Sequence, residues 1–210
     1  MPRGLFISFE GVEGCGKTTQ VDALVSWLKD KNIPTISVRD PGGTDIGEAI
    51  RHILLDPKLH TMHARSEVLL FLASRSQLTY EKILPALKKK EVVVTDRYID
   101  STYVYQAYAR HLPERLISVF NRFATAGLKP DLTFLVDIDI IKGRKRGTFD
   151  DRMESEALAY HEKVREGFLR IARRAKKRIK VLDGEKDVFA LNQEVISHVQ
   201  KVLVRKGYTV

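Results

Sequence analysis

The 210-residue chain has a single cysteine, Cys15, and this scarcity excludes one class of protein. One thiol cannot close a disulfide within the chain, so a small secreted domain held by disulfides is excluded and a cytoplasmic location is expected. Long hydrophobic runs are also missing, because none approaches the roughly 18 to 20 apolar residues of a membrane-spanning helix. The apolar run near the start ends at Glu10, which predicts a first strand and no secretion signal. We therefore expect no membrane partner.

Positive charge, in contrast, is present in excess, with 36 Lys and Arg residues against 27 Asp and Glu residues and a formal net charge of +9. Hydrophobic residues make up 43% of the chain and charged residues 30%, a balance typical of folded globular proteins. The positive surplus is compatible with three functions: nucleic-acid binding, attachment to a membrane surface, and catalysis on highly anionic small molecules.

Short, mostly apolar runs alternate with longer amphipathic stretches. This alternation is typical of right-handed βαβ units, so the sequence predicts an α/β fold with a five-stranded parallel sheet flanked by helices. The expected strands are Leu5–Phe9, Thr35–Val38, Val92–Thr95, Leu132–Val136 and Ile179–Leu182. The expected helical stretches are Thr18–Lys31, Ile46–Leu55, Ala64–Lys90, Ser101–Ala126, Ala157–Lys177 and Val188–Lys206, with Pro85 breaking the third into two helices. No flexible linker divides the chain, and residues 1–210 are expected to form one domain.

A glycine-rich segment between the first expected strand and helix matches the pattern G-x-x-x-x-G-K-[ST]. It consists of Gly11, Val12, Glu13, Gly14, Cys15, Gly16, Lys17 and Thr18. Glycines let successive backbone N–H groups converge on phosphate oxygens, and the following helix adds the positive end of its dipole. Lys17 is expected to reach the β- and γ-phosphates and the Thr18 hydroxyl to ligate Mg²⁺, whereas Cys15 is a small filler. The segment predicts binding of ATP or GTP with Mg²⁺.

A second polar segment, Asp96-Arg97-Tyr98, follows the third expected strand. Ligands of parallel sheets gather at the carboxyl ends of the strands, so this segment faces the same crevice as the glycine-rich loop. Asp96 can orient Mg²⁺-bound water or the attacking group, and Arg97 can hold a phosphate with two hydrogen bonds. The Asn-Lys-x-Asp element of GTPases is missing from the sequence, which argues against a GTPase.

Further motifs follow in order along the chain. They are Phe9-Glu10-Gly11, Asp40-Pro41-Gly42-Gly43-Thr44, Leu69-Leu70-Phe71-Leu72-Ala73-Ser74-Arg75, Ser101, Tyr105-Gln106, Gly127-Leu128-Lys129-Pro130-Asp131-Leu132-Thr133 and Val164-Arg165-Glu166-Gly167-Phe168. As an ordered set over roughly residues 5–184, they resemble the thymidylate kinase family. The resemblance implies a three-layer fold of the P-loop NTPase type with a short mobile lid. It also implies transfer of the ATP γ-phosphoryl group to thymidine monophosphate (dTMP), and a homodimer.

The same resemblance assigns roles in binding the monophosphate. Phe71 stacks on thymine and Arg75 hydrogen bonds to the base, and their i, i+4 spacing places both on one helix face. Arg97 holds the acceptor phosphate, and Glu13 contacts the sugar 3′-hydroxyl or the metal shell. The remaining assignments place Pro41 beside the thymine, Thr102 and Gln106 near the base, and Tyr105 against the deoxyribose, where it excludes a 2′-hydroxyl.

A basic segment, Lys142–Asp151, is expected to be a mobile loop within a lid of about residues 142–154. Gly14 offers no side chain that could neutralise the transferred phosphoryl group. In the family, members with glycine at this position supply arginines from the lid, which implies that Arg144 and Arg146, with Arg146 favoured, approach the phosphates. Arg152 is a further candidate for the same role. The chain departs from the family pattern in having Asp40 where glutamate is common and in having a shorter lid.

Two other functions remain open from the residues alone. One is a kinase that acts on another monophosphate, such as uridylate or cytidylate. The other is a P-loop ATPase acting on nucleic acid, suggested by the basic clusters Lys88–Lys90 and Arg173–Arg178. These clusters have no interleaved aromatics for base stacking and lie where cations suit helix ends, so no nucleic-acid partner is expected.

Overall fold

The computed structural model describes residues 4–146 and 151–209. Its strands are β1 (Phe6–Glu10), β2 (Thr35–Arg39), β3 (Val92–Asp96), β4 (Leu132–Asp137) and β5 (Ile179–Asp183). Its α-helices are α1 (Lys17–Asp30), α2 (Asp45–Leu55), α3 (Ala64–Leu78), α4 (Leu84–Lys88), α5 (Ile99–Thr102), α6 (Glu114–Ala124), α7 (Ile140–Arg144), α8 (Leu158–Arg174) and α9 (Val188–Arg205). A 3₁₀ turn, η1 (Pro57–Leu59), and two π-helical segments, η2 (Thr79–Ile83) and η3 (Tyr103–Ala109), complete the described elements.

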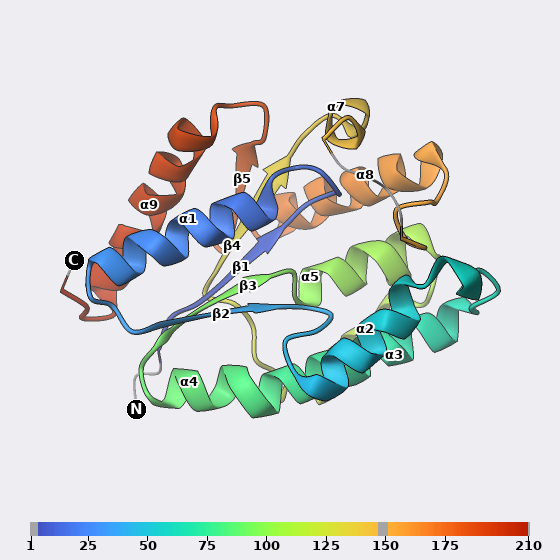
Figure 1. The fold of residues 1–210 in the computed structure, drawn as a ribbon, viewed down its shortest axis with the longest axis horizontal. Helices are drawn as coiled ribbons and strands as arrows, with labels where there is room; N and C mark the ends of the chain where they lie inside the picture. Colours follow the sequence, from blue (N-terminus) through green and yellow to red (C-terminus); the bar gives the residue numbers. More distant parts are fainter. Residues whose placement is uncertain (1–3, 147–150, 210) are drawn as a thin grey trace.

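The five strands form one parallel sheet in the order β2-β3-β1-β4-β5, with helices packed around it (Figure 1). This confirms the expected α/β class and all five expected strands. The register pairs Phe9 of β1 with Asp96 of β3 and with Phe134 of β4. The carboxyl ends of the three central strands therefore meet at one edge, which is where the glycine-rich loop begins.

The alternation of side chains along β1 explains why every residue of this strand is buried. Ile7 and Phe9 belong to a core cluster that includes buried apolar residues of α1 and α9, whereas Phe6 belongs to a second cluster with residues of η2 and α4. Because helices cover both faces of the sheet, neither set of side chains meets water. Ser8, on the same face as Phe6, is also buried, and its hydroxyl pairs with that of Thr133 at 2.7 Å.

Two helix predictions were wrong at prolines. Pro85 does not break the third stretch, because α3, η2 and α4 form one helical run. The π-helical η2 ends at Ile83, two residues before Pro85, and its wider i→i+5 bonding accommodates a residue with no N–H to donate. The stretch Ser101–Ala126 is instead interrupted between η3 and α6. There His111 has a φ of 59°, and Pro113 disfavours helical geometry in the residue before it.

The start of the expected lid is also more ordered than predicted. Residues 140–144 form α7, whose N-cap Asp139 accepts hydrogen bonds from the backbone N–H groups of Ile141 and Lys142 at 3.0 and 3.2 Å. The part of the expected lid at residues 147–150 lies outside the described residues. Among the residues that are described, no helix has both the length and the apolar character needed to cross a membrane.

Candidate active site

The glycine-rich loop joins β1 to α1 and is closely covered by α7. Gly14 has a φ of +69°, and a Cβ placed on it would lie 2.1 Å from the carbonyl oxygen of Gly143. A Cβ on Gly143 would in turn lie 2.9 Å from the carbonyl oxygen of Glu13. Only glycines fit at this crossing, so an arginine at position 14 is incompatible with the contact between the loop and α7. Lys17 is buried beneath the loop, and its Nζ donates to the Val12 carbonyl at 2.8 Å.

The side-chain oxygens of Thr18 and Asp96, two candidate metal ligands, lie close together at the carboxyl edge of the sheet. The Thr18 hydroxyl, at the start of α1, donates to Asp96 Oδ2 at 2.8 Å. No cluster of three or more His, Cys, Asp or Glu residues suited to a metal occurs in the described parts of the chain. A hydroxyl and one carboxylate suit Mg²⁺, which prefers oxygen ligands, keeps several waters and takes the rest of its ligands from substrate phosphates. The residues present fit this ion.

Arg97 lies at the centre of the site, and its backbone has an uncommon conformation. Its φ is +67°, in the left-handed region that non-glycine residues seldom adopt. Its guanidinium donates to the Gly11 carbonyl at 2.9 Å, to Glu13 Oε1 at 2.9 Å and to Ser101 Oγ at 3.3 Å, and lies over the Tyr105 ring at 5.1 Å. Strained backbone at a residue held by several polar contacts is typical of functional sites.

Glu13 accepts hydrogen bonds from Arg97 and Tyr105, two residues predicted to bind the monophosphate. Arg97 donates to Oε1, and so does the Tyr105 hydroxyl at 2.7 Å, while His161 Nδ1 lies 3.4 Å from Oε2. Burial disfavours the charge on Glu13, but Arg97, His161, Lys17 and Tyr105 outweigh it and hold its pKa well below the usual range. Glu13 is therefore an anion in the site at neutral pH.

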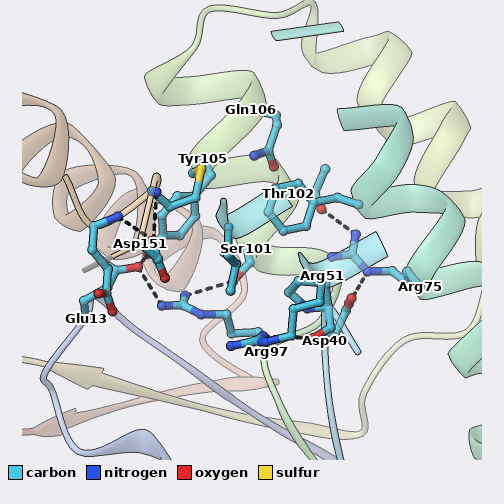
Figure 2. Close-up of a pocket in the computed structure, with 15 residues that line it drawn as sticks. Glu13, Asp40, Arg51, Arg75, Arg97, Ser101, Thr102, Tyr105, Gln106 and Asp151 are labelled. Atoms are coloured by element: carbon cyan, nitrogen blue, oxygen red, sulfur yellow. Dashed lines mark hydrogen bonds and ion pairs between the residues drawn. The ribbon is translucent and has the colours of Figure 1, made fainter. Parts of the chain in front are cut away.

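A cavity of about 130 Å³ opens beside this centre and contains the residues predicted to bind the monophosphate. Its lining includes Glu13, Pro41, Phe71, Arg75, Arg97, Thr102, Tyr105 and Gln106. Figure 2 shows Glu13 at one end of this cavity and Arg75 with Asp40 at the other, with Arg97 between them. We call this cavity the base pocket.

The Arg75 side chain is almost completely buried, with 1% of the residue exposed. Its Nε donates to Asp40 Oδ2 at 2.5 Å, and its Nη1 donates to the Thr102 hydroxyl and, at 2.7 Å, to Asn121 Oδ1. Burial raises the pKa of Asp40, and the pairing with Arg75 opposes that shift. Arg75 is thus held rigidly by three elements and presents donors to the base pocket from a fixed position.

Two larger hollows continue the base pocket toward the glycine-rich loop. The first, of about 550 Å³, is lined by Lys17, Thr18, Asp96, Arg97 and Arg51 among others, and we call it the phosphate cleft. The second, of about 510 Å³, is lined by residues 14–20 of the loop and α1, by Arg146 and by residues 184, 186–188 and 191. Counting the base pocket as the first, we call it the third hollow. Because neighbouring hollows share lining residues, the three form a continuous path across the carboxyl edge of the sheet.

The arginines expected from the lid lie in different places. Arg146 lines the third hollow, and its Nη1 donates to the Gly184 carbonyl at 3.1 Å, so in this structure it does not reach the phosphate cleft. Arg144, at the end of α7, is half-buried. Arg152 is buried and donates to the Leu54 carbonyl and to Glu67, so its role as a third lid arginine is not supported.

Comparison with known proteins gives a family for this arrangement. Residues 9–195 match the family model for thymidylate kinase. The chain belongs to the thymidylate kinase family. It is 46% identical over 204 residues to a thymidylate kinase from Caldanaerobacter subterraneus subsp. tengcongensis, with 96% of this chain and 97% of that protein covered. It is 47% identical over 188 residues to one from Carboxydothermus hydrogenoformans, with 88% and 91% covered. The crystal structure of a thymidylate kinase from Ehrlichia chaffeensis, 32% identical, superposes with a TM-score of 0.79 over 95% of this chain and 100% of that one.

Two further residues of the site in this thymidylate kinase family member, Arg51 and Glu10, have no role assigned from the sequence. Arg51 of α2 lines both the base pocket and the phosphate cleft and donates to the Pro41 carbonyl at 2.9 Å. Glu10, at the end of β1, accepts from the Ser101 hydroxyl at 2.6 Å and from the Tyr98 N–H at 2.9 Å, and so supports the segment after Arg97. Glu10 belongs to the Phe9-Glu10-Gly11 motif, which gave it no role of its own. The sequence signal for Arg51 is its position as a cation on the helix that follows the Pro41 loop.

Proposed function

We propose that the chain transfers the γ-phosphoryl group of ATP to dTMP with Mg²⁺, giving dTDP as a step toward dTTP. The activity is that of a dTMP kinase. The observation that supports it most is the continuous path of three hollows, with the glycine-rich loop at its middle and the base pocket at one end. Such a path holds two nucleotides end to end, with their phosphates meeting between Lys17 and Arg97.

The reaction needs an in-line approach and little covalent assistance from the protein. An oxygen of the dTMP phosphate forms a bond to the ATP γ-phosphorus as the bond from that phosphorus to the β,γ-bridging oxygen breaks, and ADP leaves. We assign the cradle for the ATP phosphates to residues 11–18, with Lys17 exchanging its bond to the Val12 carbonyl for the β- and γ-phosphates. Arg97 holds the acceptor phosphate, and Arg51, which also lines the cleft, adds charge.

The Thr18 hydroxyl and Asp96 would hold Mg²⁺, directly or through water, at the edge of the phosphate cleft. When bound, the ion neutralises charge on the phosphate oxygens. The direct contact between Thr18 and Asp96 fixes both side chains before any ligand enters.

At the other end of the path, Phe71 and Pro41 form apolar walls for thymine, and Arg75, Thr102 and Gln106 offer polar contacts to its edge. Tyr105 packs on the deoxyribose, where its bulk disfavours a 2′-hydroxyl. We assign Glu13 to the sugar 3′-hydroxyl or to the metal shell. These roles are supported by the shared cavity and by the family to which the chain belongs.

The lid arginines are proposed to act after a local rearrangement. Packing of Gly143 on Gly14 sets the base of the lid directly on the glycine-rich loop, so Arg144 and Arg146 begin close to the bound ATP. Arg146 must release the Gly184 carbonyl to approach the transferred phosphoryl group. Its cation would then neutralise charge that is present only during transfer.

We further propose that the protein is a single-domain cytoplasmic enzyme that forms a homodimer. Large apolar side chains remain exposed on the adjoining helices α2, α3 and α6. They are Ile46, Ile53, Leu69, Leu116, Val119 and Phe123. A second copy of the chain would cover this face. Sedimentation should show a dimer that the substitution Phe123→Glu dissociates. Phe189→Glu, the matched change at an exposed phenylalanine of α9, should leave the dimer intact. A monomeric wild-type protein would contradict the proposal.

The activity is tested by identifying the products of a mixture of protein, ATP, Mg²⁺ and dTMP. Equal amounts of ADP and dTDP are expected, with little ADP formed when dTMP is left out. ADP formation that depends on added DNA or RNA, without any dTDP, would favour the alternative of a nucleic-acid ATPase. Transfer confined to uridylate or cytidylate would favour the alternative of another monophosphate kinase.

A further inference from the structure

Glu67 of α3 is a fully buried carboxylate that lies just behind the base pocket. It shares a helix face with Phe71 and Arg75, which follow it at intervals of four residues, but it does not line the cavity. Its Oε1 accepts from Gln106 Nε2 at 3.1 Å and from Arg110 Nε at 3.2 Å. Its Oε2 accepts from Arg110 Nη2 at 3.1 Å and from Arg152 Nη1 at 2.8 Å. Every acceptor position of the carboxylate is therefore used.

The surroundings of Glu67 keep it ionised. Burial disfavours its charge, but two guanidinium groups and the Gln106 amide outweigh burial and lower its pKa. Arg110 is in turn paired with Glu156 at 2.6 Å, so two carboxylates and two guanidinium groups balance in charge. An ionised carboxylate accepts hydrogen bonds and donates none.

This fixes the orientation of the Gln106 side-chain amide. The amide has a donor end and an acceptor end, and only the donor end, Nε2, can face Glu67. Turned around, Gln106 would set its carbonyl oxygen against a carboxylate oxygen in a buried site, where neither group has a proton to share. The Oε1 end is thereby left for the base pocket, which Gln106 lines together with Thr102 (Figure 2).

We propose that Glu67 is a positioning residue that sets the hydrogen-bond polarity of the base pocket through Gln106. The pocket then offers donors from Arg75 and an acceptor from Gln106. That pair complements the C4 carbonyl and N3–H of thymine or uracil and opposes the C4 amino group and bare N3 of cytosine. The inference rests on the proposed function, because it concerns which pyrimidine monophosphate that same site accepts.

The substitution Glu67→Gln tests this directly because it changes charge with little change in shape. Arg110 and Arg152 can then donate only to the single oxygen of the new side-chain amide. The NH₂ group of that amide is left facing Gln106, and the Gln106 amide turns around to accept from it. The ratio of kcat/KM for dTMP to that for dCMP is expected to fall by at least about tenfold. The ratio for dTMP to dUMP, which share the same edge, should stay as in the wild type.

Two controls separate polarity from packing. Glu156→Gln removes the other carboxylate on Arg110 without touching Gln106, and it should leave the dTMP to dCMP ratio unchanged. In a Gln106→Met background, adding Glu67→Gln should produce no further change in the ratio. Thermal unfolding of each variant identifies those that are folded at the assay temperature.

An unchanged ratio in folded Glu67→Gln protein would overturn the proposal, and so would an equal fall in Glu156→Gln. Gln106→Met alone should also lower the ratio about tenfold. If it keeps the wild-type ratio, the proposal fails even where Glu67→Gln does not fold. Failure of the proposed function would look different, because the wild-type protein would then phosphorylate no dTMP at all.

Discussion

The base pocket and the phosphate cleft lie side by side but are built in different ways. In the base pocket, Arg75, Thr102 and Gln106 are each 1% exposed, and the structure gives each a hydrogen-bond partner. On the phosphate side, the binding surface is largely backbone of the glycine-rich loop, Thr18 is exposed, and the exposed Arg146 donates to the Gly184 carbonyl.

The difference follows from what each region must recognise. A base edge is read by a few donors and acceptors whose directions have to be fixed in advance, so the side chains that bear them are buried and tied to one another. Phosphate oxygens accept from any N–H, and a cation can approach them late, so loop backbone and movable side chains suffice. Substitutions on the phosphate side should therefore change kcat and spare stability, whereas those in the base pocket should change substrate binding and stability together.

The largest expected effect is on the phosphate side, at Lys17. Lys17→Ala removes the cation that serves the β- and γ-phosphates, and kcat should fall by about a thousandfold or more. The free energy of unfolding should change little, because the hydrogen bonds that Lys17 Nζ donates among the described residues, to the Val12 carbonyl and the Cys15 sulfur, lie within the loop. Steady-state assay and urea unfolding measure both quantities, with exposed Lys29→Ala on the same helix as the control. Near-normal turnover would refute the assignment of the loop.

Arg146→Ala should lower kcat on the order of a hundredfold and raise the KM of either nucleotide far less. Arg146 is exposed and its side chain donates to the Gly184 carbonyl at 3.1 Å, so stability should change little. Initial rates at varied ATP and varied dTMP separate kcat from KM. A change confined to the KM of ATP would leave Arg146 at the wall of the third hollow and remove it from the transfer step.

The third expected effect is a pH dependence of stability that comes from the buried carboxyl of Glu10, which accepts from Tyr98 and Ser101. Burial, and then repulsion by Asp100, raise its pKa to about 8 from 4.5. Between these values the unfolded chain releases a proton that the folded protein keeps, so the free energy of unfolding falls as pH rises. The pKa of Glu13 is lowered instead, so its contribution is lost only below pH 4.5.

The measurement is urea unfolding of wild type and Glu10→Gln at pH 5 and pH 7. The wild type should lose on the order of 2 kcal/mol more than Glu10→Gln between these pH values. Exposed Glu185→Gln should behave as the wild type. Parallel pH profiles for wild type and Glu10→Gln would show that Glu10 is ionised throughout.

The smallest expected effect sharpens the description of the base pocket. Arg75→Lys keeps a charge beside Asp40 but lacks the planar group that also reaches Thr102 and Asn121. The KM for dTMP should rise about tenfold and the free energy of unfolding should fall by about 1 kcal/mol, with the KM for ATP unchanged. Exposed Arg65→Lys on the same helix is the control. Equal increases in both KM values would move Arg75 out of the base pocket.

Much of the fold was predictable because the sheet is covered on both faces. Each strand is then a compact apolar run, and all five runs were confirmed within one residue at each end. The helix boundaries at Pro85 and Pro113 were not predictable, because a proline can be accommodated by a π-helical segment or can end a helix. Tertiary packing around it decides between these outcomes.

The candidate site was likewise predictable from the sequence only in part. Local motifs identified Lys17, Thr18, Asp96 and Arg97, and the structure brings these four together. Arg51 and Glu67 were missed, since a charged residue on an amphipathic helix looks like solvated surface until the packing of α2, α3 and η3 is known. The position of Arg146 was not predictable either, because nothing in the sequence shows that the Gly184 carbonyl lies within its reach.

The central claim is that the fixed pocket recognises thymine while the open cleft transfers phosphate. It is tested most directly by kcat/KM for dTMP, dUMP, dCMP, UMP and CMP with ATP and Mg²⁺. The account predicts the highest value for dTMP and values at least about a hundredfold lower for the cytidylates. A cytidylate or UMP that matches or exceeds dTMP would contradict it.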